Sequence, residues 1–131
     1  MDGIELKARR EALGLDNAGF AAALHLDTSA ITEFEGTARG IPDSMATRLD
    51  KLELARDTIA GVLEDALPGD LATYATDAEF WSEWPEYHGV PASVHRVAAA
   101  DALRSARWAG IQARIVPAHR HAAEESPRTA R

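Results

Sequence analysis

Four polar side chains within six residues are suited to recognising the edges of DNA bases. Thr28 and Ser29 are followed one helical turn later by Thr32 and Glu33, so a helix would carry all four on one face. Hydroxyl groups can bond to any base, and a glutamate can accept a hydrogen bond from the N4 amino group of cytosine. The surrounding segment, LDTSAITEFEG, holds three carboxylates and no Lys or Arg. These residues favour base readout but supply no attraction for phosphate.

The charge of the whole chain opposes strong non-specific binding to DNA. Its 131 residues carry a formal net charge of −7, and the acidic excess is shared by both halves of the chain. Neutralisation of phosphates by Lys and Arg supplies most non-specific affinity, so a strong DNA binder usually has a basic surface. A basic rim limited to one face still fits this composition.

The other residues with reactive side chains fit no catalytic or metal site. His88, His95, His119 and His121 lack the spacings of zinc-binding motifs. Ser93 shares a predicted helix with His95, but no acidic partner or nucleophile elbow surrounds the pair. The chain also has no Cys, and therefore no thiolate nucleophile and no disulfide. We expect a protein that is not an enzyme and that uses no cofactor and no metal.

The elements that would position the polar segment form the first half of the chain. Helices are predicted over residues 3–14, 17–24 and 28–36, and a longer helix over 42–67. Asp16 is a good N-cap for the second of these helices. Only three residues separate the second helix from the third. Two short helices joined in this way make a helix-turn-helix, whose second helix enters the major groove of DNA.

The second half of the chain changes to a mixture of strands and helices. Short strands are predicted over 71–75 and 110–117. They enclose a short aromatic helix capped by Thr76 or Asp77 and a longer helix over 91–108. The expected fold class is mainly α, with an N-terminal helix-turn-helix bundle followed by a small α+β region of strand-helix-helix-strand order. The predicted divisions are a helix-turn-helix domain with its connecting helix, an α+β region and a flexible tail, at residues 1–67, 68–117 and 118–131.

Residues 6–42 resemble the Cro/lambda-repressor (XRE) class of helix-turn-helix proteins without a gap. The family pattern has an Arg late in the first helix, a Gly-Leu pair, and a cap followed by a polar residue and Ala. It continues with an aromatic residue or Leu four residues before the turn, and with an aromatic-Glu pair at the end of the third helix. The matching residues are Arg10, Gly14-Leu15, Asp16-Asn17-Ala18, Phe20 with Leu24, and Phe34-Glu35. Two positions depart from the pattern. Glu33 stands where Gln or Arg is frequent, and Thr37 where Gly is usual.

The resemblance implies roles for individual side chains. In this family the Glu of the aromatic-Glu pair commonly bridges to the first-helix Arg, so Arg10 and Glu35 are expected to form a structural ion pair. Asn17, at a helix N-terminus, would lie at a phosphate, and Arg39 would clamp the other side of the groove. Lys7, Arg9 and Arg48 are further candidates for rim charges. The expected DNA-binding residues are Asn17, Thr28, Ser29, Thr32, Glu33 and Arg39.

The segment from Leu71 to Val116 resembles the C-terminal part of YdiL-type proteins and of phage anti-CRISPR-associated regulators. In those proteins this region forms the dimer and sets the spacing of two reading heads. The resemblance therefore implies a dimerisation region in the second half of this chain. The residues expected at the dimer interface are Phe80, Trp81, Trp84, Val94, Val97, Leu103 and Trp108.

These expectations describe a homodimeric transcription regulator, a repressor that binds an inverted-repeat operator through the helix at 28–36. Its partners would be palindromic double-stranded DNA and a second copy of the chain, with no membrane. An alternative of another class is an antitoxin-like or adaptor protein whose degenerate helix-turn-helix binds a protein. The N-terminus has no signal-peptide pattern, and no apolar run approaches the roughly 18 residues of a membrane span. A cytoplasmic location, in a bacterium or as a phage product, is expected.

Overall fold

The structure, a computed structural model, describes residues 1–36 and 40–118. Within these ranges the chain is mainly helical with one small parallel sheet, which confirms the predicted fold class. The elements are α1 (Gly3–Ala12), α2 (Asn17–Leu24), α3 (Thr28–Gly36), α4 (Asp43–Asp65), β1 (Gly69–Thr73), α5 (Asp77–Glu83), the 3-10 helix η1 (Pro85–Tyr87), α6 (Ala92–Trp108) and β2 (Ala113–Pro117). The predicted tail, apart from Ala118, lies outside the described residues, as do Thr37, Arg39, His119 and His121.

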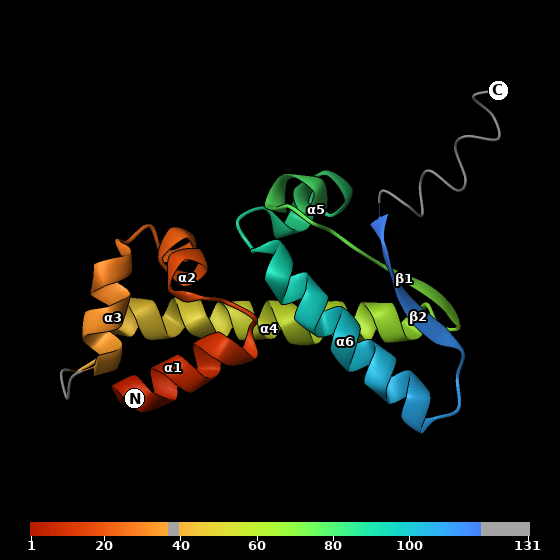
Figure 1. The fold of residues 1–131 in the computed structure, drawn as a ribbon, viewed down its shortest axis with the longest axis horizontal. Coiled ribbons are helices and arrows are strands. Elements are labelled where there is room, and N and C mark those ends of the chain that lie inside the picture. The colour runs from red at the N-terminus through yellow and green to blue at the C-terminus, as the bar shows by residue number, and fades with distance from the viewer. Residues whose placement is uncertain (37–39, 119–131) are drawn as a thin grey trace.

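The long helix α4 is shared by both halves of the molecule. Its 23 residues, at a rise of about 1.5 Å each, extend over about 35 Å. In Figure 1 it runs along the long axis, with α1, α2 and α3 around its N-terminal half. α6 crosses it, and the two strands lie near its C-terminal end (Figure 1). The helix-turn-helix formed by α2 and α3 therefore packs at the N-terminal end of α4.

A first hydrophobic core joins α1 to α4. Leu6, Phe20, Ile31 and Leu49 come from the four helices in turn, and all are fully buried. Val94 of α6 is buried in the same core. The packing of the helix-turn-helix region therefore continues into the second half of the chain.

A second core lies between α4, α6 and the strands. Ile59 and Phe80 are fully buried there, and α6 adds a face of small side chains from Ala98, Ala99 and Ala102. Small residues let two helices approach closely, because interaxial distance follows side-chain size. The alanine-rich composition of α6 is thus explained by its crossing with α4.

The sheet consists of β1 and β2 side by side, in parallel, with Gly69 opposite Ala113. Both strands differ from their predicted bounds. β1 begins two residues early and ends at Thr73, after which the Tyr74 ring packs into the second core. β2 begins at Ala113 because Gly110, at φ +72°, first closes α6 and a short loop follows.

Local hydrogen bonds fix where the short helices begin. The Asp16 carboxylate accepts from the Gly19 N–H at 2.7 Å, which confirms it as the N-cap of α2. Thr76 caps α5 by accepting from the Glu79 N–H. Asp77 instead caps a different helix, because its carboxylate accepts from the Ala92 N–H at the start of α6 (2.8 Å).

Candidate nucleic-acid interface

Helix α3 lies at one end of the molecule, beside α2 (Figure 1). Its inner face is fixed by Ile31, which is fully buried, and by Phe34. The four candidate base-reading residues are all exposed: Thr28, Ser29, Thr32 and Glu33. The outer face of α3 is thus polar and open, as insertion into a major groove requires.

A short chain of hydrogen bonds links α2 to the outer face of α3. The Asn17 amide donates to Thr32 Oγ1, and the Thr32 hydroxyl donates to the carbonyl oxygen of Thr28, both at 3.3 Å. Asn17 Oδ1 is shielded from solvent and has no hydrogen-bond partner among the described residues. The sequence suggests a phosphate contact for Asn17, and in this structure its amide holds the two helices in register. The Thr32 hydroxyl is oriented by the same bonds.

A buried ion pair anchors the C-terminal end of α3 to α1. Arg10 Nε and Nη2 donate to the two carboxylate oxygens of Glu35, at 2.7 and 3.0 Å, and both side chains are less than a tenth exposed. Arg10 Nη1 also donates to the Leu15 carbonyl oxygen at 2.7 Å. The hydrogen bonds to Glu35 raise the pKa of Arg10. The pair implied by the family resemblance is therefore present, and Glu35 holds α3 in place instead of facing solvent.

The candidate rim cations differ in how they are engaged. Arg9 donates to Glu53 (3.0 Å) and Asp50 (2.8 Å), and these hydrogen bonds raise its pKa. Arg48 donates to the carbonyl oxygen of Gly89, in the second half of the chain. Lys7 is exposed on α1. Of the described candidate cations on α1, Arg9 is therefore already engaged by carboxylates, which leaves Lys7 as the candidate for a basic rim.

The residues expected at a dimer interface differ in their burial. Phe80 and Val94 are fully buried in the two cores of the chain itself, so their assignment to an interface is wrong. Their apolar character reflects packing within one chain. Trp81, Trp84, Val97 and Leu103 are half-buried. The two indole N–H groups donate internally, to the Val90 carbonyl oxygen and to the Tyr74 hydroxyl. Trp108 is 87% exposed and is available to a partner.

Among the described residues considered for catalysis and metal binding, no site is formed. Ser93 Oγ and both ring nitrogens of His95 are shielded from solvent, and none has a hydrogen-bond partner in the described part of the chain. His95 lies instead among aromatic rings, with centroids of Tyr74 and Phe80 both 5.0 Å away. Within residues 1–36 and 40–118, no group of three or more His, Asp or Glu could hold a metal. None of the helices described is long and apolar enough to span a membrane.

A cleft between α2 and the start of α6 was not anticipated from the sequence. It has a volume of about 540 Å³, and Arg48, Trp81, Ser93 and Arg96 are among its lining residues. These residues share no sequence motif and come from α4, α5 and α6. The sequence shows only the types of these residues. Their proximity depends on how the helices cross, which the sequence does not show.

The chain matches no protein-family model and no curated protein sequence.

Proposed function

We propose that the chain is a sequence-specific DNA-binding transcription regulator, a homodimeric repressor that binds an inverted-repeat operator through α3. The observation that supports this most is the construction of α3. Its inner face is held by a buried core and by the Arg10–Glu35 pair, whereas its outer face offers exposed hydroxyl and carboxylate groups. Such a rigidly mounted polar helix suits base readout in the major groove.

In this proposal α3 determines which bases are recognised, and dimerisation sets the spacing of the two half-sites. Thr28, Ser29, Thr32 and Glu33 would face base edges, and Arg39 would contribute a phosphate contact. Asn17 would act mainly by orienting Thr32, to which its amide donates. Two copies related by a two-fold axis would read half-sites about 34 Å apart, one turn of DNA. The exposed Trp108 is the residue that we assign to the contact between copies.

Selection from a random double-stranded DNA library tests this proposal. The purified chain should enrich an inverted repeat whose half-sites are centred about one helical turn apart. Ser29→Glu, which adds a negative charge to the outer face of α3, should abolish enrichment. Ser82→Glu, an exposed position on α5, is the matched control and should leave it intact. Enrichment of no motif, or equal enrichment by both variants, would rule the proposal out.

The second candidate function is a protein-binding module of the antitoxin or adaptor type. The observation that favours it is the charge around α3, since the helix has no Lys or Arg and Arg9 of α1 is engaged by carboxylates. Non-specific DNA affinity depends on such cations. Under this reading the library would yield no motif, and the α3 face would instead bind a basic protein surface.

A further inference from the structure

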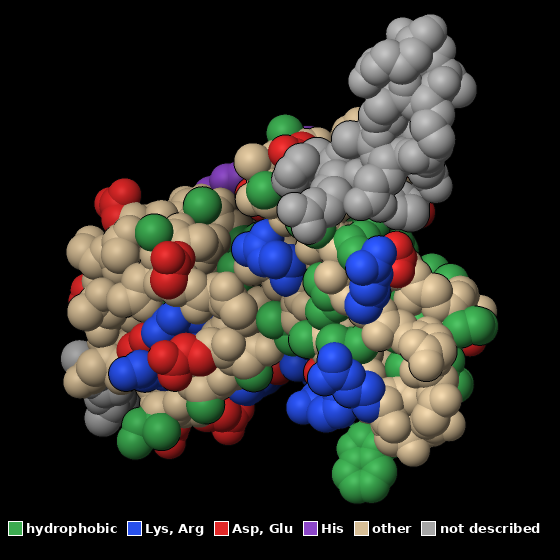
Figure 2. Space-filling view, turned by 45° about the vertical axis from the view of Figure 1, so that its right-hand side comes forward, with side chains coloured by type: hydrophobic (Ala, Val, Ile, Leu, Met, Phe, Trp, Pro, Cys, Tyr) green, Lys and Arg blue, Asp and Glu red, His purple; other side chains and the backbone are tan. Residues whose placement is uncertain are grey.

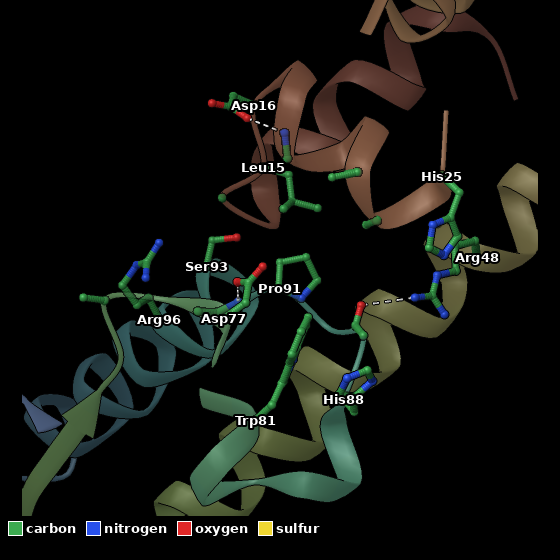
Figure 3. Close-up of a pocket in the computed structure, with 17 residues that line it drawn as sticks. Leu15, Asp16, His25, Arg48, Asp77, Trp81, His88, Pro91, Ser93 and Arg96 are labelled. Carbon is green, nitrogen blue, oxygen red and sulfur yellow. Dashed lines mark hydrogen bonds between the residues drawn. The ribbon is translucent and has the colours of Figure 1, made fainter. Parts of the chain in front are cut away.

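The cleft between α2 and the start of α6 is a separate concave site, distinct from the outer face of α3. Its volume of about 540 Å³ lies within the range of about 300–1,000 Å³ that is usual for small-molecule sites. In Figure 3, Leu15 faces Pro91 and Trp81 across the cleft. Arg96 lies on one side, and Arg48 with His25 lies on the other (Figure 3). The middle of the cleft therefore combines apolar side chains with the Asp77 carboxylate, and an arginine lies on each side.

The two arginines of the cleft are unusual for this acidic chain. The described arginines at five other positions form ion pairs with carboxylates: Arg9, Arg10, Arg56, Arg104 and Arg114. Within residues 1–36 and 40–118, Arg48 and Arg96 donate to backbone carbonyl oxygens and to no carboxylate: Arg48 to that of Gly89 (3.2 Å) and Arg96 to that of Tyr74 (2.7 Å). In a chain with a net charge of −7, two arginines left without a described carboxylate beside one cleft favour an anionic ligand.

The two carboxylates that also line the cleft are engaged by backbone N–H groups. Asp16 accepts from Gly19 N–H and Asp77 from Ala92 N–H, and the positive ends of α2 and α6 offset their charge. Ser93 Oγ is shielded from solvent and has no partner among the described residues, and Figure 3 shows it directed toward the cleft.

We propose that this cleft binds a small organic dianion, a dicarboxylate or a phosphorylated carboxylic acid, with Arg48 and Arg96 each facing one acidic group. The apolar side chains of Leu15, Trp81 and Pro91 contact the carbon chain between the two acidic groups. One wall belongs to the helix-turn-helix and the other to α5 and α6, so the ligand ties the two halves together. The binding itself does not depend on the proposed DNA recognition.

Amide chemical shifts of the full ¹⁵N-labelled chain test the binding, with succinate and 3-phosphoglycerate as probes and without DNA. At least one probe should cause saturable shifts at Gly19, Ala22 and Ala92, which line the cleft. Dimethyl succinate, which is neutral, and NaCl at matched ionic strength should not. The proposal is overturned if neither dianion gives saturable shifts there, or if the neutral ester or NaCl reproduces them.

Variants assign the binding to the two arginines. Arg96→Gln and Arg48→Gln should each weaken the responding probe about tenfold, because a charge-assisted hydrogen bond is lost. Arg107→Gln is the matched control, since Arg107 also has no described carboxylate partner but lies outside the cleft. Equal weakening by Arg107→Gln would contradict the assignment.

A second pair of variants does not disturb the Arg48–Gly89 hydrogen bond. Ala22→Leu places a larger side chain in the cleft from an exposed position of α2 and should abolish binding. Ala18→Leu, on the same helix but not lining the cleft, should bind as the unchanged chain does. Undiminished binding to Ala22→Leu would place the ligand elsewhere and overturn the proposal.

Discussion

Glu33 is the side chain of α3 whose chemistry most constrains how the helix would read DNA. It is exposed on the outer face, one residue after Thr32, whose hydroxyl is oriented by Asn17. A carboxylate there can accept from cytosine N4, or it can repel the phosphate backbone. The two roles give different results on substitution.

We predict that Glu33→Gln shifts the preferred base at one position of each half-site, with a change in discrimination of about 1–3 kcal/mol. The measurement is a competition assay against all four bases at each position. Glu64→Gln, on the exposed face of α4, is the control and should alter nothing. Uniformly tighter binding with unchanged preference would show that Glu33 only repels phosphate.

The Arg10–Glu35 pair makes a prediction about stability. Glu35→Ala leaves the Arg10 guanidinium buried without its carboxylate, and breaking a buried pair in this way costs about 3–5 kcal/mol. Urea unfolding should show this loss. Asp101→Ala removes the partner of Arg104, which is largely exposed, and should cost no more than about 1 kcal/mol. Similar losses for both variants would contradict the structural role of Glu35.

His95 predicts a pH dependence of stability. Burial, and secondarily the charge of Arg96, lowers the pKa of His95 to about 4, against an ordinary value of about 6.5 in the unfolded chain. Between these values the unfolded state binds more protons, so the free energy of unfolding falls as the pH drops. The fall reaches about 3 kcal/mol at pH 4 and is less than about 0.5 kcal/mol above pH 6.5.

Urea unfolding at pH 7 and pH 5 measures this effect. His95→Leu, which removes the titrating group, should lose less stability between the two pH values than the unchanged chain. His88→Gln, at an exposed histidine, should keep the full dependence. The same pH dependence in all three proteins would contradict the assignment to His95.

At the scale of elements, the contact between α1 and α3 depends on a glycine. A Cβ atom at Gly3 would lie 2.5 Å from the carbonyl oxygen of Glu35 and 2.6 Å from that of Phe34. Both are backbone atoms and cannot move aside as a flexible side chain would. Gly3 thus sets how closely the first helix approaches the end of the proposed recognition helix.

Gly3→Ala should therefore destabilise the fold by about 1–3 kcal/mol. Gly61→Ala provides the opposite case, because Gly61 lies within α4 and nothing stands within 4 Å of an added Cβ. That substitution should stabilise by about 0.5–1 kcal/mol through helix propensity. Thermal unfolding of the two variants compares them directly. A neutral Gly3→Ala would mean that α1 and α3 are not in close contact.

The helices of the first half could be predicted from local signals. α2 and α3 have the predicted bounds, because Asp16 supplies a cap and the turn is too short to be anything else. The pairing of β1 with β2 could not be predicted, since it joins residues 44 apart such as Gly69 and Ala113 and depends on how α6 crosses α4. The burial of Phe80 and Val94 within one chain could not be predicted either. Phe80 and Val94 are apolar whether they face a core or a second copy, and only packing within the chain distinguishes the two.

At the scale of the whole molecule, the two halves share α4 and meet at the cleft. The exposed face of α3 lies at one end of the long axis, and β1 and β2 lie near the other (Figure 1). Figure 2 shows, on the face turned toward the viewer, basic side chains over the second half, and basic and acidic side chains mixed together near the helix-turn-helix. The positive charge of this face is therefore not concentrated at the helix proposed to read bases. In this acidic chain, affinity for DNA would have to come largely from specific contacts.

The affinity of the chain for DNA as a function of salt tests the central claim most directly. The DNA upstream of its own gene should contain an inverted repeat that binds more tightly than a scrambled duplex at every salt concentration. The logarithm of the binding constant should fall linearly with the logarithm of salt, with a slope of about −0.9 for each phosphate contacted. Undetectable binding at low salt, or equal affinity for the scrambled duplex, would contradict the account.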